Sequence, residues 1–140
     1  KRQPFDTECN AAYLHKKAAG RSVPVKNFIM NNSIVAGIGN IYANESLFAA
    51  GIRPTRSAGK ISRKKWAHLL KHIRDVLNHA ICCGGSTISD FIGASGEKGY
   101  FQMNFAVYGK FDQPCPRCES LIKAIKLGGR ASFFCPTCQR

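Results

Sequence analysis

The sequence is poor in acidic residues. Eight Asp and Glu stand against 21 Lys and Arg in 140 residues, which gives a formal net charge of +13 at pH 7. The basic residues are spread from Lys1 to Arg140 and do not gather in a tail. An imbalance of this size indicates a polyanionic partner, and it favours nucleic acid over a membrane surface or an ordinary basic protein.

Long apolar runs are also missing. None reaches the length of a membrane span, and the first ten residues, KRQPFDTECN, contain no signal-peptide hydrophobic stretch. We therefore expect a monomeric cytoplasmic protein that makes no membrane contact. The chain starts at Lys1 with no initiator methionine, and we expect it to be a piece of a longer protein.

The cysteines do not suit a disulfide framework. Their number, seven, is odd, and only four form regular pairs, Cys115-Pro-Arg-Cys118 and Cys135-Pro-Thr-Cys138. Two C-x-x-C turns separated by sixteen residues are typical of a zinc ribbon or finger, because each turn delivers two thiolates to one metal. We predict one structural Zn2+ bound by these four cysteines. The alternative, a redox pair, usually occurs once and beside a βαβ unit.

Apolar spacing and turn residues predict a mainly α fold. The expected helices span residues 6–19, capped within Asp6 to Glu8, residues 24–30, residues 40–50, and residues from Ser62 to Gly84-Gly85. The last is the clearest, since its apolar residues recur every three or four positions. These residues are Trp66, Leu69, Leu70, Ile73, Leu77, Ala80 and Ile81, and the opposite basic face carries Lys64, Lys65, Lys71, His72 and Arg74.

The character of the sequence changes after residue 92. We expect residues 1–92 to form the four-helix domain, and residues 93–110, which begin GASGEKG, to form a flexible loop and an extended connector. Residues 111–140 are too few for a core of their own and need the metal to fold. The segment LIKAIKLGGRASFF predicts a β-hairpin that turns at Gly128-Gly129. Its residues available for packing are Leu121, Ile122, Phe133 and Phe134.

The stretch GIGNIYANESLF, residues 37–48, places two glycines and an asparagine at the start of an expected helix. It does not complete a dinucleotide-binding fingerprint, because Tyr42 occupies the third glycine position. Backbone N–H groups at a helix N-terminus attract anions, and glycine lets a phosphate approach the main chain. We predict a phosphate-binding turn in which Asn40 caps the helix or donates to phosphate; a simple helix cap is the alternative. Arg130, after the hairpin glycines, should project with its guanidinium free, unless it is an ordinary surface arginine.

Several stretches resemble the formamidopyrimidine-DNA glycosylase and endonuclease VIII family of bacterial base-excision repair enzymes. IVAGIGNIYANESLFAAGIRP is similar to the helix–two-turns–helix motif of that family. GGSTISDF, GYFQMNFAVYGK, PCPRC and GGRASFFCPTCQR are similar to the remainder of its formamidopyrimidine branch. The resemblance covers nearly the whole chain. It implies the carboxy-terminal half of such a protein, in which the helical motif and a zinc finger together bind damaged duplex DNA.

The resemblance also implies roles for particular residues. Asn40 and Arg130 would contact phosphates around the lesion, and Lys26 would lie close to it. Gly39 and Tyr42 complete the expected DNA-binding set. The loop of residues 94–100 would close over an everted oxidised purine, and its candidate contacts are Ser95, Lys98 and Tyr100.

The catalytic group that the resemblance implies has no counterpart in this chain. Family members attack the sugar with an amino-terminal proline amine, helped by an adjacent glutamate on a separate β-sandwich lobe, whereas this chain begins Lys1-Arg2-Gln3-Pro4. No adjacent acidic pair suits acid–base chemistry, and the four histidines are best explained as ordinary helix residues. They are His15, His68, His72 and His79. We therefore expect activity only with the missing amino-terminal lobe.

The expected function is that of the DNA-binding half of a DNA glycosylase and AP lyase. The parent protein would extrude an oxidised purine, 8-oxoguanine or a formamidopyrimidine, from duplex DNA and excise it. A stand-alone DNA- or RNA-binding module with structural zinc is the alternative. A third interpretation, a helix-hairpin-helix motif at GIG, gives no reason for the terminal zinc module. Preference for duplex DNA over structured RNA distinguishes the first two.

Overall fold

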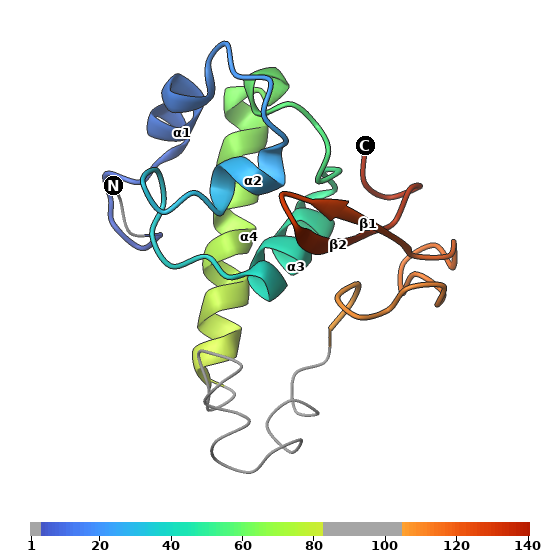
Figure 1. Cartoon of the computed structure of the whole chain (residues 1–140). Helices are drawn as coiled ribbons and strands as arrows, with labels where there is room; N and C mark the ends of the chain where they lie inside the picture. The colour runs from blue at the N-terminus through green and yellow to red at the C-terminus, as the bar shows by residue number, and fades with distance from the viewer. Residues whose placement is uncertain (1–3, 83–104) are drawn as a thin grey trace.

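The computed structural model describes residues 4–82 and 105–140, and within them the fold is mainly α-helical, as predicted (Figure 1). Four α-helices precede one antiparallel hairpin. The helices are α1 (Ala11–Ala18), α2 (Val25–Ile29), α3 (Asn40–Ala50) and α4 (Arg63–Cys82), and a short 3-10 turn, η1 (Ala58–Lys60), precedes α4. Strands β1 (Lys123–Leu127) and β2 (Arg130–Phe134) pair with Leu127 opposite Arg130.

The predicted start of the first helix is wrong. Residues 6–9 form turns, in which the N–H of Cys9 donates to the carbonyl of Asp6 at 3.1 Å. The helix begins at Ala11 because Asn10 caps it, and its side-chain oxygen accepts the N–H of Tyr13 at 2.9 Å. The aspartate and glutamate before Cys9 are therefore not the cap.

Arg74 explains why the N-terminal segment is not helical, and it is not a solvent-facing charge of α4 as predicted. Its guanidinium donates to three carbonyls of that segment at 2.7–3.2 Å, which belong to Pro4, Asp6 and Cys9. Three carbonyls that accept hydrogen bonds from Arg74 must point toward one guanidinium, so the segment forms turns and packs against α4. A helical pattern cannot reveal a side chain that binds backbone almost 70 residues earlier.

The other helix boundaries agree closely with the sequence. Ser62 caps α4, because its hydroxyl accepts the N–H of Lys65 at 3.2 Å. Helix α3 spans the predicted residues, and Gly51 ends it in the left-handed region with φ of 73°. Pro24 lies one position before the start of α2, at its N-cap. These three ends rely on local chemistry, which the sequence displays directly.

The hydrophobic core lies where α1, α2 and α3 pack around the long α4 (Figure 1). The predicted apolar face of α4 is buried: Trp66, Leu69, Leu70 and Ile73 are at most 4 % exposed. The ring centroids of Trp66 and Phe28, the latter from α2, lie 5.3 Å apart. The side chains of Ala80 and Ile81 lie outside the described residues. No helix within residues 4–82 and 105–140 is long and apolar enough to cross a membrane.

Residues 105–140 form a smaller unit that lies beside α3 (Figure 1). The hairpin turns at Gly128-Gly129, as predicted. Ile122 is buried, but the neighbouring Leu121 is 54 % exposed, so its predicted packing role is wrong. Successive residues of extended backbone face opposite sides, and only one of these two can face inward. The predicted extended connector is also wrong where it is described, since residues 106–109 form bends and turns.

Candidate nucleic-acid interface and zinc site

The four paired cysteines converge at one point. Their sulfur atoms all lie within 4.8 Å of one another, with 3.9 Å between Cys115 and Cys138 and 3.4 Å between Cys118 and Cys135. A tetrahedron with Zn–S bonds of about 2.3 Å has edges of about 3.8 Å, so the cluster fits one zinc ion. Four thiolates leave no position for water or substrate, and the site is therefore structural.

The four thiols can all ionise only when a cation lies among them. A hydrogen bond from the Ser120 side chain lowers the pKa of Cys118 to about 6, whereas burial raises the pKa of Cys138 to about 12. Four sulfurs this close cannot all carry negative charge without a positive charge among them. Zinc supplies that charge, and its binding free energy becomes folding free energy for the finger.

Buried polar side chains fasten the finger to the helical domain. Gln139 is fully buried; its side-chain oxygen accepts the N–H of Cys135 at 2.8 Å, and its amide nitrogen donates to the carbonyl of Ile52 at 2.9 Å. Arg53 donates to the carbonyls of Pro136 and Gln139 at 2.8 and 3.2 Å. The second cysteine turn is thus tied to the segment that follows α3. Residue spacing carried no signal for Gln139 or Arg53.

The glycine turn before α3 exposes its backbone. Gly37 adopts a φ of 83°, which disfavours other residues, while Ile38 is 4 % exposed and anchors the turn in the core. Gly39 has an ordinary φ of −80°, and a Cβ there would only touch the Tyr42 ring at 3.6 Å. Backbone conformation therefore does not require glycine at position 39. Glycine would be required at position 39 only if a bound group approached the main chain there from solvent.

The first turn of α3 has no side-chain cap. Gly39 is the N-cap residue, and Asn40 is the first helical residue, so of the two roles considered for Asn40 the helix cap is excluded. The Asn40 amide instead donates to the carbonyl of Ala131 in β2 at 3.1 Å. Tyr42 is 8 % exposed, and its side chain packs in an apolar cluster with Ile41. Any DNA contact of Tyr42 would have to come mainly from its backbone.

One carbonyl of the hairpin brings the predicted residues together. The Ala131 oxygen accepts from the Lys26 ammonium at 3.3 Å, from Asn40, and from the Asn44 amide at 3.5 Å. Residue 130 is adjacent, and the Arg130 side chain is exposed. Lys26, Asn40 and Arg130, which are far apart in sequence, therefore lie together on one side of the molecule, where Arg130 is exposed and Lys26 is only 1 % exposed.

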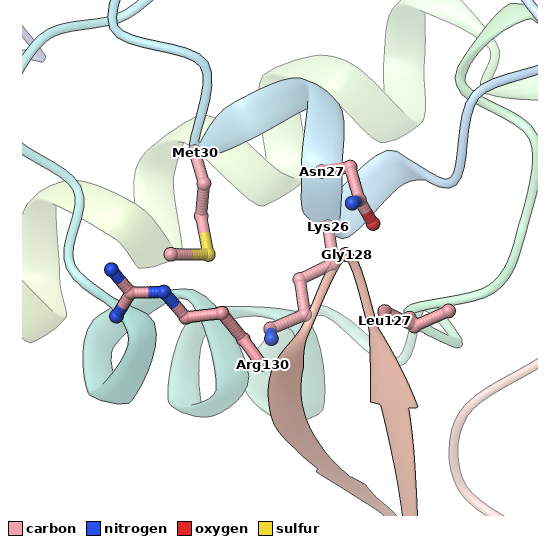
Figure 2. A pocket seen from close by; sticks show the side chains of 6 residues that line it. All are labelled: Lys26, Asn27, Met30, Leu127, Gly128 and Arg130. Atoms are coloured by element: carbon pink, nitrogen blue, oxygen red, sulfur yellow. The ribbon is translucent and has the colours of Figure 1, made fainter.

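A pocket of about 210 Å³ lies between α2 and the hairpin tip (Figure 2). It is lined by Lys26, Asn27, Met30, Leu127, Gly128 and Arg130. Figure 2 shows the Lys26 ammonium and the Arg130 side chain entering this region from α2 and from β2. Burial and the nearby Arg130 charge lower the pKa of Lys26 to about 8. Gly128, with φ of 58°, packs so closely on Asn27 that a Cβ would collide with its amide.

Glu45 is a further residue that sequence reasoning missed. Its carboxylate accepts three consecutive backbone N–H groups, those of Ala106, Val107 and Tyr108, at 2.7, 2.9 and 3.0 Å. Three consecutive backbone N–H groups can point toward one carboxylate only where the backbone turns, so this connector is not extended. The Tyr108 ring then packs edge-on against Phe133 at 5.3 Å. Glu45 thereby holds the start of the finger against α3.

The loop predicted to cover the lesion lies outside the described residues. Its candidate contacts Ser95, Lys98 and Tyr100 fall within residues 83–104, and they remain predictions. The same holds for the expected connector at residues 101–104.

Comparisons with known proteins agree with this arrangement. The model of the family described as "Formamidopyrimidine-DNA glycosylase H2TH domain" matches residues 1–92, and that described as "Zinc finger found in FPG and IleRS" matches residues 112–140. The formamidopyrimidine-DNA glycosylase of Psychromonas ingrahamii is 50 % identical over 98 % of this chain and 51 % of its own length. That of Pseudomonas savastanoi is 51 % identical over 99 % of this chain and 51 % of its own length.

Solved structures give the same result. The MutM (Fpg) protein of Thermus thermophilus has a TM-score of 0.85 at 34 % identity, covering 98 % of this chain and 52 % of that one. The Lactococcus lactis Fpg bound to DNA containing an AP site has a TM-score of 0.83 at 30 % identity, covering 99 % of this chain and 49 % of that one. The chain spans about half the length of the curated relatives it matches. The zinc-finger match and the cysteine geometry confirm the predicted structural zinc, and the chain belongs to the formamidopyrimidine-DNA glycosylase family.

Proposed function

We propose that these 140 residues form the DNA-binding half of a DNA glycosylase and AP lyase that removes oxidised purines from duplex DNA. The observation that carries this proposal is the shared face on which Lys26, the Asn40 turn and Arg130 meet. Of the six residues that line the pocket on this face, two are cationic and none is acidic. A relative of the same fold was solved on DNA containing an abasic site, which supports the same ligand here.

The two expected phosphate contacts differ in chemistry. The Asn40 turn offers backbone N–H groups at the positive end of the α3 dipole, with exposed glycine backbone that a phosphate can approach closely. Arg130 offers a planar guanidinium from a hairpin tip that zinc and α2 hold in place. Neither contact reads a base edge, so both suit an enzyme that must bind any sequence around a lesion.

We propose that the chemistry of base excision resides outside these residues. Opening of the glycosidic bond in this type of enzyme needs a nucleophilic amine, and the resemblance assigns it to a proline on another lobe. The histidines do not suggest a second centre: the rings of His68 and His72 pack edge-on against one another on α4, 4.6 Å apart. The curated relatives are bacterial proteins, and we place the site of action at the bacterial nucleoid.

The proposal is tested by DNA titrations of single variants. The Asn40 amide has two N–H groups; one donates to Ala131, which leaves the second for phosphate. Asn40→Ala and Arg130→Ala should therefore each weaken binding to an abasic-site duplex by about 1–3 kcal/mol, as for a lost hydrogen bond to a charged group. Arg130→Ala should also reduce the salt dependence by about one released counterion. The matched control is Lys71→Ala on α4, where an exposed lysine offers only diffuse charge and its loss should cost far less. A structured RNA of equal charge should compete poorly.

Two outcomes would contradict the proposal. If Lys71→Ala weakens binding as much as Arg130→Ala, DNA is held by diffuse charge and not by two defined contacts. If the structured RNA binds better than the duplex, the stand-alone nucleic-acid module is the better description. Borohydride treatment with an oxidised-guanine duplex tests the catalytic part, since an imine would be reduced to a permanent protein–DNA adduct. We expect no adduct from these residues alone.

A further inference from the structure

Strand β2 has an open edge that faces α3. The hairpin has only two strands, so β2 pairs with β1 on one side, and its other edge has no partner strand within the described residues. The N–H of Phe133 and the carbonyl of Ala131 belong to that edge, because both bind side chains of the helices. Such groups are costly to bury without partners.

Asn44 supplies the partners that a third strand would have supplied. Its side-chain oxygen accepts the Phe133 N–H at 2.7 Å, and its amide nitrogen lies 3.5 Å from the Ala131 oxygen. The same nitrogen donates to the Asn40 carbonyl at 2.8 Å. Asn44 is 1 % exposed, and an amide is well suited to this place because it carries an acceptor and a donor side by side, like a peptide group.

This residue connects the two expected DNA contacts. Asn44 lies one helical turn after Asn40, and residues four apart on a helix are neighbours on one face. Its partners in β2 begin one residue after Arg130. We propose that Asn44 is a positioning residue, which fixes the Arg130 hairpin relative to the Asn40 turn and so sets the spacing at which two phosphates are bound. This inference rests on the proposed function and adds to it a residue that does not itself touch DNA.

Other bonds keep the hairpin attached when Asn44 is replaced. Lys26 and Asn40 still donate to Ala131, and Gln139 and Arg53 still hold the cysteine turn. Removal of Asn44 should therefore loosen the hairpin without releasing it or the zinc. The consequence is a change in the position of Arg130, which separates this role from a general contribution to folding.

A double-mutant cycle on DNA binding tests the proposal. Asn44→Ala should bind an abasic-site duplex about five- to tenfold more weakly than the unchanged protein, as for the loss of well-formed hydrogen bonds. In the Arg130→Ala background the same change should alter affinity by no more than about twofold, because the group that Asn44 positions is already missing. Asn78→Ala, an exposed asparagine of α4, is the matched control and should be neutral in both backgrounds.

Hydrogen exchange gives a readout that needs no DNA. The Phe133 amide should exchange faster in Asn44→Ala, with zinc content and helical signal unchanged. Where Asn44→Ala loses zinc, Asn44→Ser, whose hydroxyl can still bind one edge group, is used for the same cycle. Equal losses in both backgrounds, or unchanged exchange at Phe133, would overturn the inference. Absence of Arg130-dependent binding in the unchanged protein would instead overturn the proposed function and the inference built on it, even if exchange at Phe133 still responds.

Discussion

The helical domain (residues 4–82) and the zinc finger (residues 105–140) are held together by different forces. The helical core contains eighteen buried residues from all four α-helices and the connecting segments. The finger cluster contains five, of which Cys115 and Cys135 are zinc ligands and Phe48 belongs to α3. Burial of apolar surface is the main stabilising contribution that the structure shows for the first unit. The second depends on a metal and on a neighbour, so each unit should fail in its own way.

The largest expected effect is the loss of a zinc ligand. Cys135→Ser should abolish stoichiometric zinc binding, because structural zinc contributes about 10 kcal/mol or more to folding of such modules. Elemental analysis should show metal loss, and NMR should show residues 111–140 disordered while the helical signal remains. Cys9→Ala, a buried cysteine outside the cluster, is the matched control and should retain zinc. Stoichiometric zinc in Cys135→Ser would disprove the ligand assignment.

A core truncation should damage the other unit. Leu69 is fully buried in the helical core, and Leu69→Ala should lower the free energy of unfolding by about 2–5 kcal/mol through lost contacts and a cavity. Denaturant titration followed by circular dichroism measures this loss, and the folded variant should still bind one zinc. Leu121→Ala removes the same atoms from a side chain that is 54 % exposed, and should change stability little. A loss at Leu121 as large as that at Leu69 would show that burial does not determine what these side chains contribute to stability.

The connection between the units gives a smaller effect. Glu45→Gln replaces one carboxylate oxygen by an NH2 group, which cannot accept a hydrogen bond. At least one of the three backbone N–H groups that Glu45 binds therefore loses its partner. We expect local protection at residues 106–108 to fall by about 1–3 kcal/mol, measured by hydrogen exchange. Glu119→Gln, at an exposed position of the finger, is the control. Unchanged protection would show that Glu45 does not hold the connector.

The smallest effect is a change in proton binding at Lys26. Its pKa is about 8 in the folded protein against 10.5 for an ordinary lysine, so the unfolded chain binds more protons between these values. Stability should therefore rise with pH from about 8 to 10.5 through this group. Arg130→Ala removes one of the two causes and should move the NMR titration midpoint of Lys26 upward, whereas Arg63→Ala should not. A Lys26 midpoint that does not change in Arg130→Ala would show that the Arg130 charge has no influence on Lys26.

The sequence predicted what depends on local patterns. The α4 face, the Ser62 cap, the Gly51 end and the cysteine turns follow from spacing and residue chemistry within a few positions. The contacts made by Arg74, Glu45 and Asn44 could not be predicted in this way, because each joins a side chain to backbone far away in the sequence. Arg74 is 65 residues from Cys9, Glu45 is 61 residues from Ala106, and Asn44 is 89 residues from Phe133. Because every residue except proline has the same backbone groups, the sequence does not indicate which backbone group a side chain binds. For the same reason, the predicted start of α1 and the predicted extended backbone at residues 106–109 were wrong.

The site was predicted in part. Asn40 and Arg130 were named from the glycine turn and the hairpin tip, and Lys26 from the resemblance. The structure brings the three together, but their contacts with DNA remain proposals. The cap role of Asn40 is excluded because Gly39 is the N-cap and Asn40 already lies in the first turn of α3. The Asn40 amide instead donates to a hairpin carbonyl 91 residues later. Tyr42 was expected to bind DNA, and its side chain is 8 % exposed. The contacts of both side chains arise from packing between segments, which local patterns do not contain.

The junction at β2 restricts the sequence of the helices more than it restricts the sequence of the strand. On the helical side the bonds come from side chains, those of Lys26, Asn40 and Asn44, whereas on the hairpin side they come from the main chain of residues 131 and 133. Main-chain atoms are the same whatever residue stands there, apart from proline at 133, which has no N–H. Residues 131 and 133 can therefore vary while this junction keeps its bonds, but Gln139, whose side chain binds the Ile52 carbonyl, and Gly128, which packs on Asn27, cannot vary as freely. A finger taken from a relative should dock on these helices if it keeps these two residues, whereas helices taken from that relative would dock only if they kept the three side chains that bind β2.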